Sequence, residues 1–268
     1  MSLNSPNIFL RTYDAGGNRF FVAPPGVLFL PDEVAFLCRR WGCDGLLMGF
    51  ADRFGEISLR IANGDGTAAE MSGNGVRIYF KYLLDSELVT GKTCAIRAAG
   101  GTIRCELCGD GSIGALLGPC RIAPSPVSLF PPLGHISGRI VSVGNPHFVV
   151  AVERFPKNWQ RLGSAICANK IFADAGTNVE FSKVTGCDSV ELRVWERGVG
   201  RTKSCGSGAA CAAALLAKSF SSPRAIAVSM EGGTLEAIPV GDCVRIVGKI
   251  FSGAAIETEL GRWLNGQP

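Results

Sequence analysis

The stretches "ISLRIANGDGTAAEMSGNG" at residues 57–75 and "VELRVWERGVGRTKSCGSG" at residues 190–208 decide the organisation of this chain. At an offset of 133 residues, a leucine, an arginine and two turn glycines of the first stretch coincide with those of the second. Ser72 then coincides with Cys205. Because the offset holds over strand-like and turn-like positions together, the chain is predicted to contain an internal repeat.

The repeat extends beyond these stretches, since the triplet "GGT" at 100–102 recurs at 232–234. Each half is predicted to run strand, loop, glycine turn, helix and then a meander of short strands. The predicted helices are "GVRIYFKYLL" and "GAACAAALLAKSF", and the predicted strands include "GTIRCEL" and "CVRIVGKI". A proline-rich segment at 119–134 separates the halves. We therefore predict two similar domains, at residues 1–122 and 135–260.

Composition favours a globular protein with a small-molecule partner. The 268 residues are 47% apolar and 19% charged, and the net charge of +4 is spread without long runs of like charge. This pattern gives no electrostatic case for nucleic acid or an anionic membrane surface. No apolar run reaches the roughly 18 residues of a membrane span, and the first residues lack the features of a signal peptide. We expect a cytoplasmic location.

The eleven cysteines are predicted to be mainly reduced, small, buried side chains, because an odd number cannot all pair. Cys105 and Cys108 form the Cys-x-x-Cys spacing once, whereas a zinc ribbon needs two close pairs. No metal site is therefore predicted. The segment "CELCGDGSIGALL" also matches Gly-x-Gly-x-x-Gly, but its alternation around Asp-Gly is typical of a hairpin and not of a nucleotide-binding turn.

A glycine turn that opens a helix has a chemical use. The first N–H groups of a helix lack intrahelical partners and lie at the positive end of its dipole, so both turns can bind an anion. Two such sites that meet would hold one carboxylate, with Ser72 and Cys205 on opposite sides of the carbon that bears it. A helix N-terminus lowers the pKa of a cysteine, so Cys205 is expected to form a thiolate.

Over nearly its full length the chain resembles the diaminopimelate epimerase family. The resemblance lies in "AGGNRFFV", "IANGDGTAAEMSGNG", "VSVGNPHFVV", "GTNVEF" and "ERGVGRTKSCGSGAACA". It implies an α/β (α+β) fold of two homologous domains, each a curved, mainly antiparallel sheet or barrel around a central helix. The active site would lie between them, and the last residues would pack back on the first domain. The implied reaction inverts one α-carbon of LL-2,6-diaminopimelate to give the meso isomer, without pyridoxal or any other cofactor.

The resemblance also implies the site. Cys205 and Ser72 would be the catalytic pair, and His147 a supporting residue whose contact with substrate the sequence leaves open. Arg197 suits a bidentate grip on a carboxylate and Glu196 a nearby ammonium, which favours a substrate with an amino acid at each end. The implied substrate-binding residues are Asn18, Asn63, Gly73, Asn74, Asn145, Asn178, Glu196, Arg197, Gly206 and Ser207. A homodimer is the expected assembly.

Three positions depart from the family pattern. Ser72 replaces the first catalytic cysteine, Arg201 replaces a glutamate, and Arg19 replaces an aspartate. A thiol has a pKa of about 8.5, whereas the pKa of a hydroxyl, like that of water, is far higher, so an alkoxide costs up to roughly 10 kcal/mol more to form than a thiolate. Serine is therefore a poor base, although it can relay a proton. Whether Ser72 is a natural adaptation or an introduced Cys→Ser change stays open.

Three other functions are compatible with the residues. A dehydratase or isomerase of the same superfamily needs only one base, which suits a lone Cys205, but the retained Glu196-Arg197 pair argues against it. A non-catalytic amino-acid-binding protein would explain Ser72 and an intact carboxylate site together. A cysteine hydrolase would have to use His147 or His135, because the chain has no other histidine.

Overall fold

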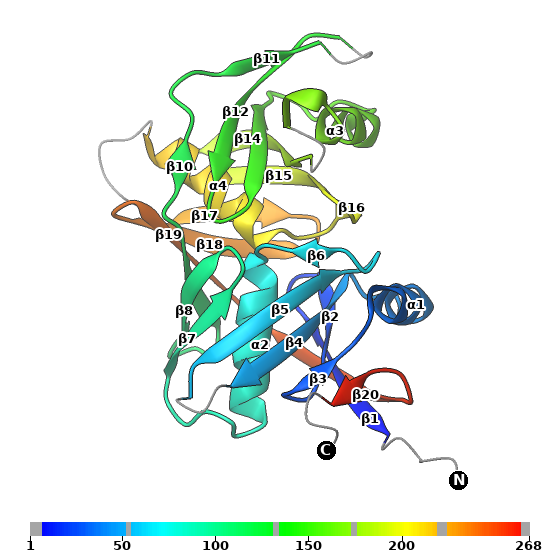
Figure 1. The fold of residues 1–268 in the computed structure, drawn as a ribbon. Helices are drawn as coiled ribbons and strands as arrows, with labels where there is room; N and C mark the ends of the chain where they lie inside the picture. The colour runs from blue at the N-terminus through cyan, green and yellow to red at the C-terminus, as the bar shows by residue number, and fades with distance from the viewer. Residues whose placement is uncertain (1–6, 52–54, 131–133, 173–175, 219–223, 264–268) are drawn as a thin grey trace.

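The computed structural model describes residues 7–51, 55–130, 134–172, 176–218 and 224–263, which form two lobes (Figure 1). One lobe holds the first half of the repeat. Its elements are β1 (Ile8–Asp14), β2 (Arg19–Val22), β3 (Val27–Leu28), α1 (Pro31–Trp41), β4 (Gly45–Ala51), β5 (Ile57–Asn63), β6 (Ala68–Ala69), α2 (Gly73–Asp85), β7 (Thr93–Ala98), β8 (Gly101–Leu107) and β9 (Ile113–Leu117).

The second half follows the same order. Its elements are β10 (Arg121–Ile122), β11 (Val127–Leu129), β12 (Ile136–Ser142), β13 (Pro146–Ala151), α3 (Trp159–Cys167), the 3-10 helix η1 (Lys170–Phe172), β14 (Asn178–Gly186), β15 (Ser189–Glu196), β16 (Gly200–Thr202), α4 (Gly206–Lys218), β17 (Ile226–Met230), β18 (Gly233–Val240) and β19 (Cys243–Gly248). Strands β20 (Phe251–Thr258) and β21 (Arg262–Trp263) follow.

The predicted repeat is confirmed in the elements and in their pairing. Helices α2 and α4 begin 133 residues apart, at Gly73 and Gly206. Strand β4 runs parallel to β2 and antiparallel to β5, and β14 has the same relations to β13 and β15. Parallel pairing of β5 with β7 likewise recurs in β15 with β17. The predicted strand "GTIRCEL" is β8, and "CVRIVGKI" contains β19.

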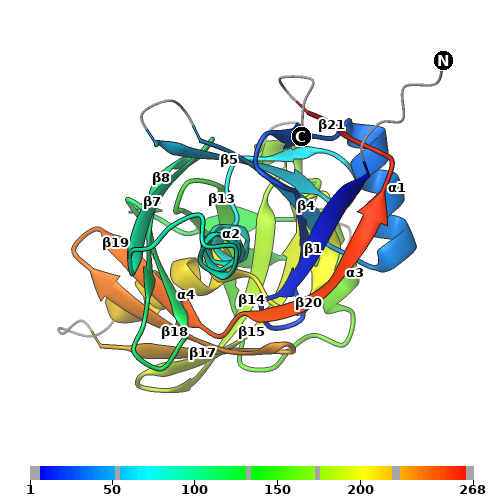
Figure 2. The ribbon, with the colours of Figure 1, turned by 90° about the horizontal axis from the view of Figure 1, so that it is seen from below.

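Each lobe wraps its sheet around one buried helix, as predicted. Figure 2 shows α2 end-on inside a ring of strands. Helix α2 is buried at consecutive positions from Gly73 to Phe80, and α4 from Gly206 to Ala214, so neither helix presents a polar face to solvent there. The end predicted for the second helix, Phe220, lies outside the described residues. The mixed α/β class and the central helices are therefore confirmed.

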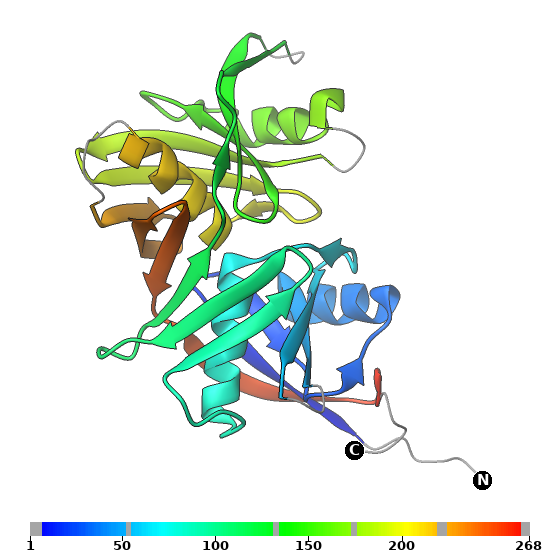
Figure 3. The ribbon, with the colours of Figure 1, turned by 60° about the vertical axis from the view of Figure 1, so that its left-hand side comes forward.

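The halves exchange strands where one ends and the other begins. Strand β9 of the first half pairs antiparallel with its equivalent β19 of the second, and β20, which follows the second half, pairs with β1 of the first. Figure 3 shows the green and brown segments of this exchange running between the lobes. The proline-rich segment 119–134 is thus not only a linker, because β10 and β11 lie within it. The domain limits at 122 and 135 stay a prediction.

The remaining structural predictions concern turns, metals and membranes. The hairpin around Asp-Gly is confirmed, because β8 pairs antiparallel with β9 and the Gly111 N–H donates to the Cys108 carbonyl at 3.0 Å. Among the residues that the structure describes, no three His, Cys, Asp or Glu side chains cluster as metal ligands. In the same residues, no helix is long and apolar enough to cross a membrane.

Candidate active site

The two buried helices meet end to end at their N-termini. A Cβ atom added to Gly73 would lie 2.9 Å from the backbone nitrogen of Ser207, and one added to Gly206 would lie 2.9 Å from the backbone carbon of Gly73. Only glycine permits this approach. The N–H groups of the first helical residues have no intrahelical partners, so the junction gathers donors from both halves. It is the arrangement expected of a shared carboxylate site.

Ser72 is the N-cap of α2. Its backbone is extended, with φ −142° and ψ 115°, and its Oγ accepts the N–H of Gly75 at 3.0 Å. The side chain is half-buried. Serine is a favoured N-cap residue, because its short hydroxyl satisfies one of the unpaired N–H groups. Ser72 therefore has a structural function in the turn besides any chemical one.

Asn74 ties the start of α2 to the other half. Its Nδ2 donates to Asn18 Oδ1 at 3.0 Å and to Ser204 Oγ at 3.2 Å. Asn18 in turn donates to Asp44 at 2.8 Å, and the buried Arg77 guanidinium donates to Asn74 Oδ1 at 2.7 Å. Both asparagines are buried, so these hydrogen bonds fix their orientation. The network holds Asn18 and Asn74 beside the junction.

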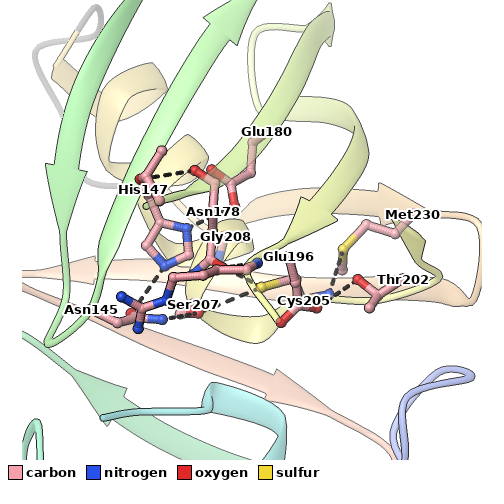
Figure 4. Close-up of polar contacts among 12 residues, drawn as sticks. Asn145, His147, Asn178, Glu180, Glu196, Thr202, Cys205, Ser207, Gly208 and Met230 are labelled. Carbon is pink, nitrogen blue, oxygen red and sulfur yellow. Dashed lines mark hydrogen bonds and ion pairs between the residues drawn. The ribbon is translucent and has the colours of Figure 1, made fainter. Parts of the chain in front are cut away.

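Cys205 lies at the equivalent position of α4 and is 3% exposed. Its Sγ accepts the N–H of Gly208 at 3.4 Å and lies 3.5 Å from the Ser207 hydroxyl, as Figure 4 shows. The Cys205 N–H approaches the sulfur of Met230 at 3.3 Å. The thiol therefore contacts the first turn of the helix, as expected for a cysteine at a helix start.

A buried polar group lies behind Cys205. His147 Nδ1 is 2.7 Å from Glu180 Oε1, and His147 Nε2 is 3.0 Å from Asn145 Oδ1. Asn145 also donates to the Ser207 hydroxyl at 3.4 Å (Figure 4). Because both ring nitrogens are occupied and the side chain is fully buried, His147 supports its neighbours in this structure and offers no free nitrogen to a substrate.

The expectation that the helix start makes Cys205 a ready thiolate is wrong for this structure. Burial raises the pKa of the Cys205 thiol well above its ordinary value, and the nearby carboxyls of Glu196 and Glu180 raise it further. The hydrogen bonds from Ser207 and Gly208 act in the opposite direction but are outweighed. The resting thiol is therefore protonated.

Glu196 is the second shifted group at the site. Burial raises its pKa to about 7, opposed by the hydrogen bond from Thr202, whose hydroxyl donates to Glu196 Oε1 at 2.6 Å. Carboxyls of Asp44 and Glu180 add to the increase. Glu196 thus changes charge near neutral pH, which is the behaviour of a group that meets a cationic ligand or a proton.

The residues implied for the distal end of the substrate lie across the gap between halves. Asn178 accepts the Arg197 N–H at 2.9 Å, and the Arg197 guanidinium forms an ion pair with Glu70 of the first half. A Cβ added to Gly198 would lie 3.2 Å from Asn63 Nδ2. The loop that carries Arg197 therefore packs against Asn63. The structure thus brings Arg197, Asn63 and Asn178 together at the interface of the lobes.

Two departures from the family pattern lie at the edge of this region. Arg201 is an exposed side chain that pairs with Glu231. Arg19 is exposed, and its backbone N–H donates to Asp44 at 2.8 Å. Neither side chain contacts Cys205 or Ser72 among the interactions that the structure shows for them.

Sequence reasoning missed several polar residues of the site. They are Asp44, Arg77, Glu180, Thr202 and Ser204. A signal existed for Glu180, because it stands between apolar residues in "NVEF", in a strand otherwise expected to be buried. A carboxylate at such a position is rare unless it is paired.

Comparison with known proteins agrees with this geometry. The family model for diaminopimelate epimerase matches residues 32–122 and 139–243, one segment in each half. A diaminopimelate epimerase of Synechocystis is 32% identical over 77% of this chain and 80% of its own length. One from Desulforudis audaxviator is 30% identical over 92% of this chain and 96% of its own. The chain belongs to the diaminopimelate epimerase family.

Solved structures extend the fold beyond this family. A probable proline racemase from Agrobacterium radiobacter superposes with a TM-score of 0.74 at 17% identity, covering 94% of this chain and 92% of that one. A phenazine biosynthesis protein of the PhzF family from Bacillus anthracis gives 0.72 at 14% identity, covering 94% and 99%. At these identities the likeness establishes the shared two-lobed fold.

Proposed function

We propose that the protein is a pyridoxal-independent diaminopimelate epimerase that interconverts LL- and meso-2,6-diaminopimelate. The observation that carries the proposal is the contact of two equivalent helix starts, with Cys205 on one and Ser72 on the other. Donors from both turns would hold the reacting carboxylate, so the α-carbon would lie between the sulfur and the hydroxyl. This geometry suits removal of a proton from one face and its return to the other.

The distal end of the substrate would lie along the interface of the lobes. Arg197 would bind the distal carboxylate, and Asn63 and Asn178 would contact the same amino-acid end. Glu196 would meet an ammonium group. Diaminopimelate carries both kinds of group, whereas lysine lacks the distal carboxylate. We therefore expect LL- or meso-diaminopimelate to bind much more tightly than lysine.

Cys205 would act as the base once substrate is bound. An ammonium beside Glu196 offsets the negative charge that raises the pKa of the thiol, and the Gly208 N–H and Ser207 hydroxyl stabilise the sulfur anion. The thiolate would take the α-proton from its own face. Ser72, a poor base, would relay a proton from water to the opposite face.

The enzyme would need no cofactor, act in the cytoplasm as a homodimer, and bind small amino acids rather than nucleic acid. A single base without inversion would make it a dehydratase or isomerase of the superfamily. Binding without proton exchange would make it an amino-acid-binding protein.

Solvent hydrogen exchange separates these functions. Each diaminopimelate stereoisomer is incubated in deuterated water, and chiral separation with mass spectrometry follows deuterium at the α-carbon. The isomer whose hydrogen faces Cys205 should exchange faster than it inverts, while the isomer that faces Ser72 exchanges little. Cys205→Ala should abolish both processes. Exchange that survives this change, or equal exchange from both isomers, would overturn the proposed role of Cys205.

A further inference from the structure

A chain of hydrogen bonds leads from a buried carboxyl to the Cys205 sulfur. Glu180 on β14 lies 2.7 Å from His147 Nδ1, and His147 Nε2 lies 3.0 Å from Asn145 Oδ1. Asn145 Nδ2 donates to Ser207 Oγ at 3.4 Å, and that oxygen lies 3.5 Å from the sulfur. All five side chains are buried, and Figure 4 shows them beside one another.

The chemistry of the groups sets the direction of this chain. Asn145 Oδ1 only accepts, so His147 Nε2 must carry a hydrogen. The amide nitrogen of Asn145 only donates, so the Ser207 oxygen accepts on that side. The hydroxyl hydrogen of Ser207 is then available for the sulfur. We propose that Glu180 is a positioning residue, which acts through His147 and Asn145 to hold the Ser207 hydroxyl as a donor to Cys205.

Glu180 is the group that selects this direction. A neutral imidazole carries one hydrogen, and without a partner at Nδ1 either nitrogen can hold it. In this geometry the His147–Glu180 pair holds two hydrogens: one on Nε2, which Asn145 Oδ1 requires, and one between Nδ1 and Glu180 Oε1, whether it is closer to oxygen or to nitrogen. Glu180 therefore occupies Nδ1 and leaves Nε2 as the donor to Asn145. Within the described chain Glu180 Oε2 has no hydrogen-bond partner. Burying a carboxyl oxygen without a partner destabilises the folded state, which indicates that Glu180 has a function other than stabilising the fold.

The equivalent network in the first half runs the opposite way. Asn74 stands where Ser207 stands, and it donates to Asn18, which donates to Asp44. Leu47, at the repeat position of Glu180, is apolar. This network therefore leads away from Ser72, whereas the second one leads toward Cys205.

A competing explanation predicts the opposite sign. The ionisable groups that face Cys205 are Glu196 from β15, Glu180 from β14 with its partner His147, and Cys211 from α4 itself. If Glu180 were only a buried negative charge, its removal would lower the pKa of the thiol. If it orients the Ser207 hydroxyl, its removal takes a donor from the thiolate and raises that pKa.

The test is the pH dependence of Cys205 alkylation by iodoacetamide, read by mass spectrometry. Fragment spectra must separate Cys205 from Cys211, since no lysine or arginine lies between them. The lost hydrogen bond to a charged group is worth about 1–2 pH units, and the lost carboxyl charge acts in the opposite direction, so Glu180→Leu should raise the midpoint by about one pH unit net. Glu180→Gln, which keeps a hydrogen-bonding group opposite Nδ1, should shift it less. Ser182→Ala, on the same strand, is the control and should leave it unchanged.

A double-mutant cycle then tests the route. In a Ser207→Ala background, Glu180→Leu should no longer raise the midpoint, because the final donor is gone. Should Glu180→Leu fail to fold, Asn145→Ala breaks the same chain and should raise the midpoint alike. A lowered midpoint, equal shifts for the Gln and Leu variants, or additive effects with Ser207→Ala would overturn the inference. It rests on the proposed role of Cys205 as a base, but alkylation needs no turnover, so the two can fail separately.

Discussion

Ser72 and Cys205 occupy equivalent positions in the two halves, and each accepts the N–H of the third residue of its helix, Gly75 or Gly208. The side chains behind these turns differ. A Cβ on Gly75 would meet Leu47 at 3.2 Å, whereas one on Gly208 would meet Glu180 at 2.6 Å.

The same contrast continues in the neighbouring strands. Phe20 pairs with Gly45 in the first half, and His147 pairs with Asn178 at the repeat position in the second. Phe20 thus stands where the second half has His147, and Leu47 stands where it has Glu180, so apolar residues occupy the places of the ionisable His147–Glu180 pair. The duplicated backbone gives both turns the geometry expected of an anion site. Of the two turns, that of Cys205 has the buried ionisable pair of Glu180 and His147 behind it. This asymmetry agrees with a hydroxyl in one turn and a thiol in the other.

Restoring the symmetry of the two turns should have the largest effect. Ser72→Cys replaces a hydroxyl by a thiol that can donate and accept protons near neutral pH. We expect epimerisation to rise by the ~10²–10⁴ typical of a general acid-base group, measured as turnover of LL-diaminopimelate. Ser182→Cys, at a buried serine of β14 outside the junction, is the control for adding a thiol. Unchanged or lower turnover for Ser72→Cys would identify serine as the adapted residue.

Glu196 belongs to the second half only, since Asn63 stands at its repeat position. Its pKa is raised from 4.5 to about 7, so the folded state holds this proton more tightly than the unfolded state. The tighter proton binding adds to the free energy of unfolding. This contribution is fully present below about pH 4.5 and is lost as pH rises to about 7. The full shift corresponds to about 3 kcal/mol, and partial exposure reduces this to about 2 kcal/mol.

Glu196→Gln should therefore flatten the pH dependence of unfolding between pH 4.5 and 7. Urea denaturation across this range measures the effect. Glu259→Gln, an exposed carboxyl, controls for the loss of one negative charge. If the parent and Glu196→Gln lost stability in parallel as pH rose, Glu196 would not be the group that titrates.

The two third-position glycines should respond differently to alanine. At Gly75 the new methyl group meets flexible or small neighbours at 3.1 Å or more, and alanine favours helix by about 1 kcal/mol, so the net change is small. At Gly208 it meets Glu180, which His147 holds in place. Overpacking costs about 1–3 kcal/mol there, and Gly208→Ala should be the less stable variant by about 2 kcal/mol. Equal denaturation midpoints would show that Glu180 can move freely.

The sequence predicted the repeat because glycine turns and amphipathic strands leave a local pattern. The offset between Ser72 and Cys205 placed both helices, whose predicted starts at Gly75 and Gly208 lie two residues after the observed ones, and the alternation around Asp-Gly located the β8–β9 hairpin. The short strands β10 and β11 were missed, because two or three residues give no period and prolines obscure them.

The site was harder to predict than the fold. The residue types at the junction could be read from the repeat, but the pKa of Cys205 depends on burial and on carboxyls from β14 and β15, which only the fold brings together. A helix start alone predicted the wrong direction. The hydrogen-bond network behind Cys205 likewise joins residues from three elements that are far apart in the chain.

The smallest predicted effect concerns the residues two positions before Ser72 and Cys205. Glu70 of the first half corresponds there to Lys203 of the second. Glu70 forms an ion pair with Arg197, and its side chain is 46% exposed. Exposed pairs contribute about 0–1 kcal/mol, so Glu70→Gln should hardly change stability. It should, however, release Arg197 from a competing carboxylate.

Since Arg197 is proposed to bind the distal carboxylate of diaminopimelate, Glu70→Gln should tighten binding of that ligand by up to about fivefold, or about 1 kcal/mol. Lysine has no distal carboxylate, so its weaker binding should stay unchanged. Calorimetry with both ligands measures the difference. Glu106→Gln is a matched control, because Glu106 is similarly exposed at 40% and pairs with Arg245. An equal gain for lysine would assign the effect to net charge, and no gain for diaminopimelate would place the distal carboxylate away from Arg197.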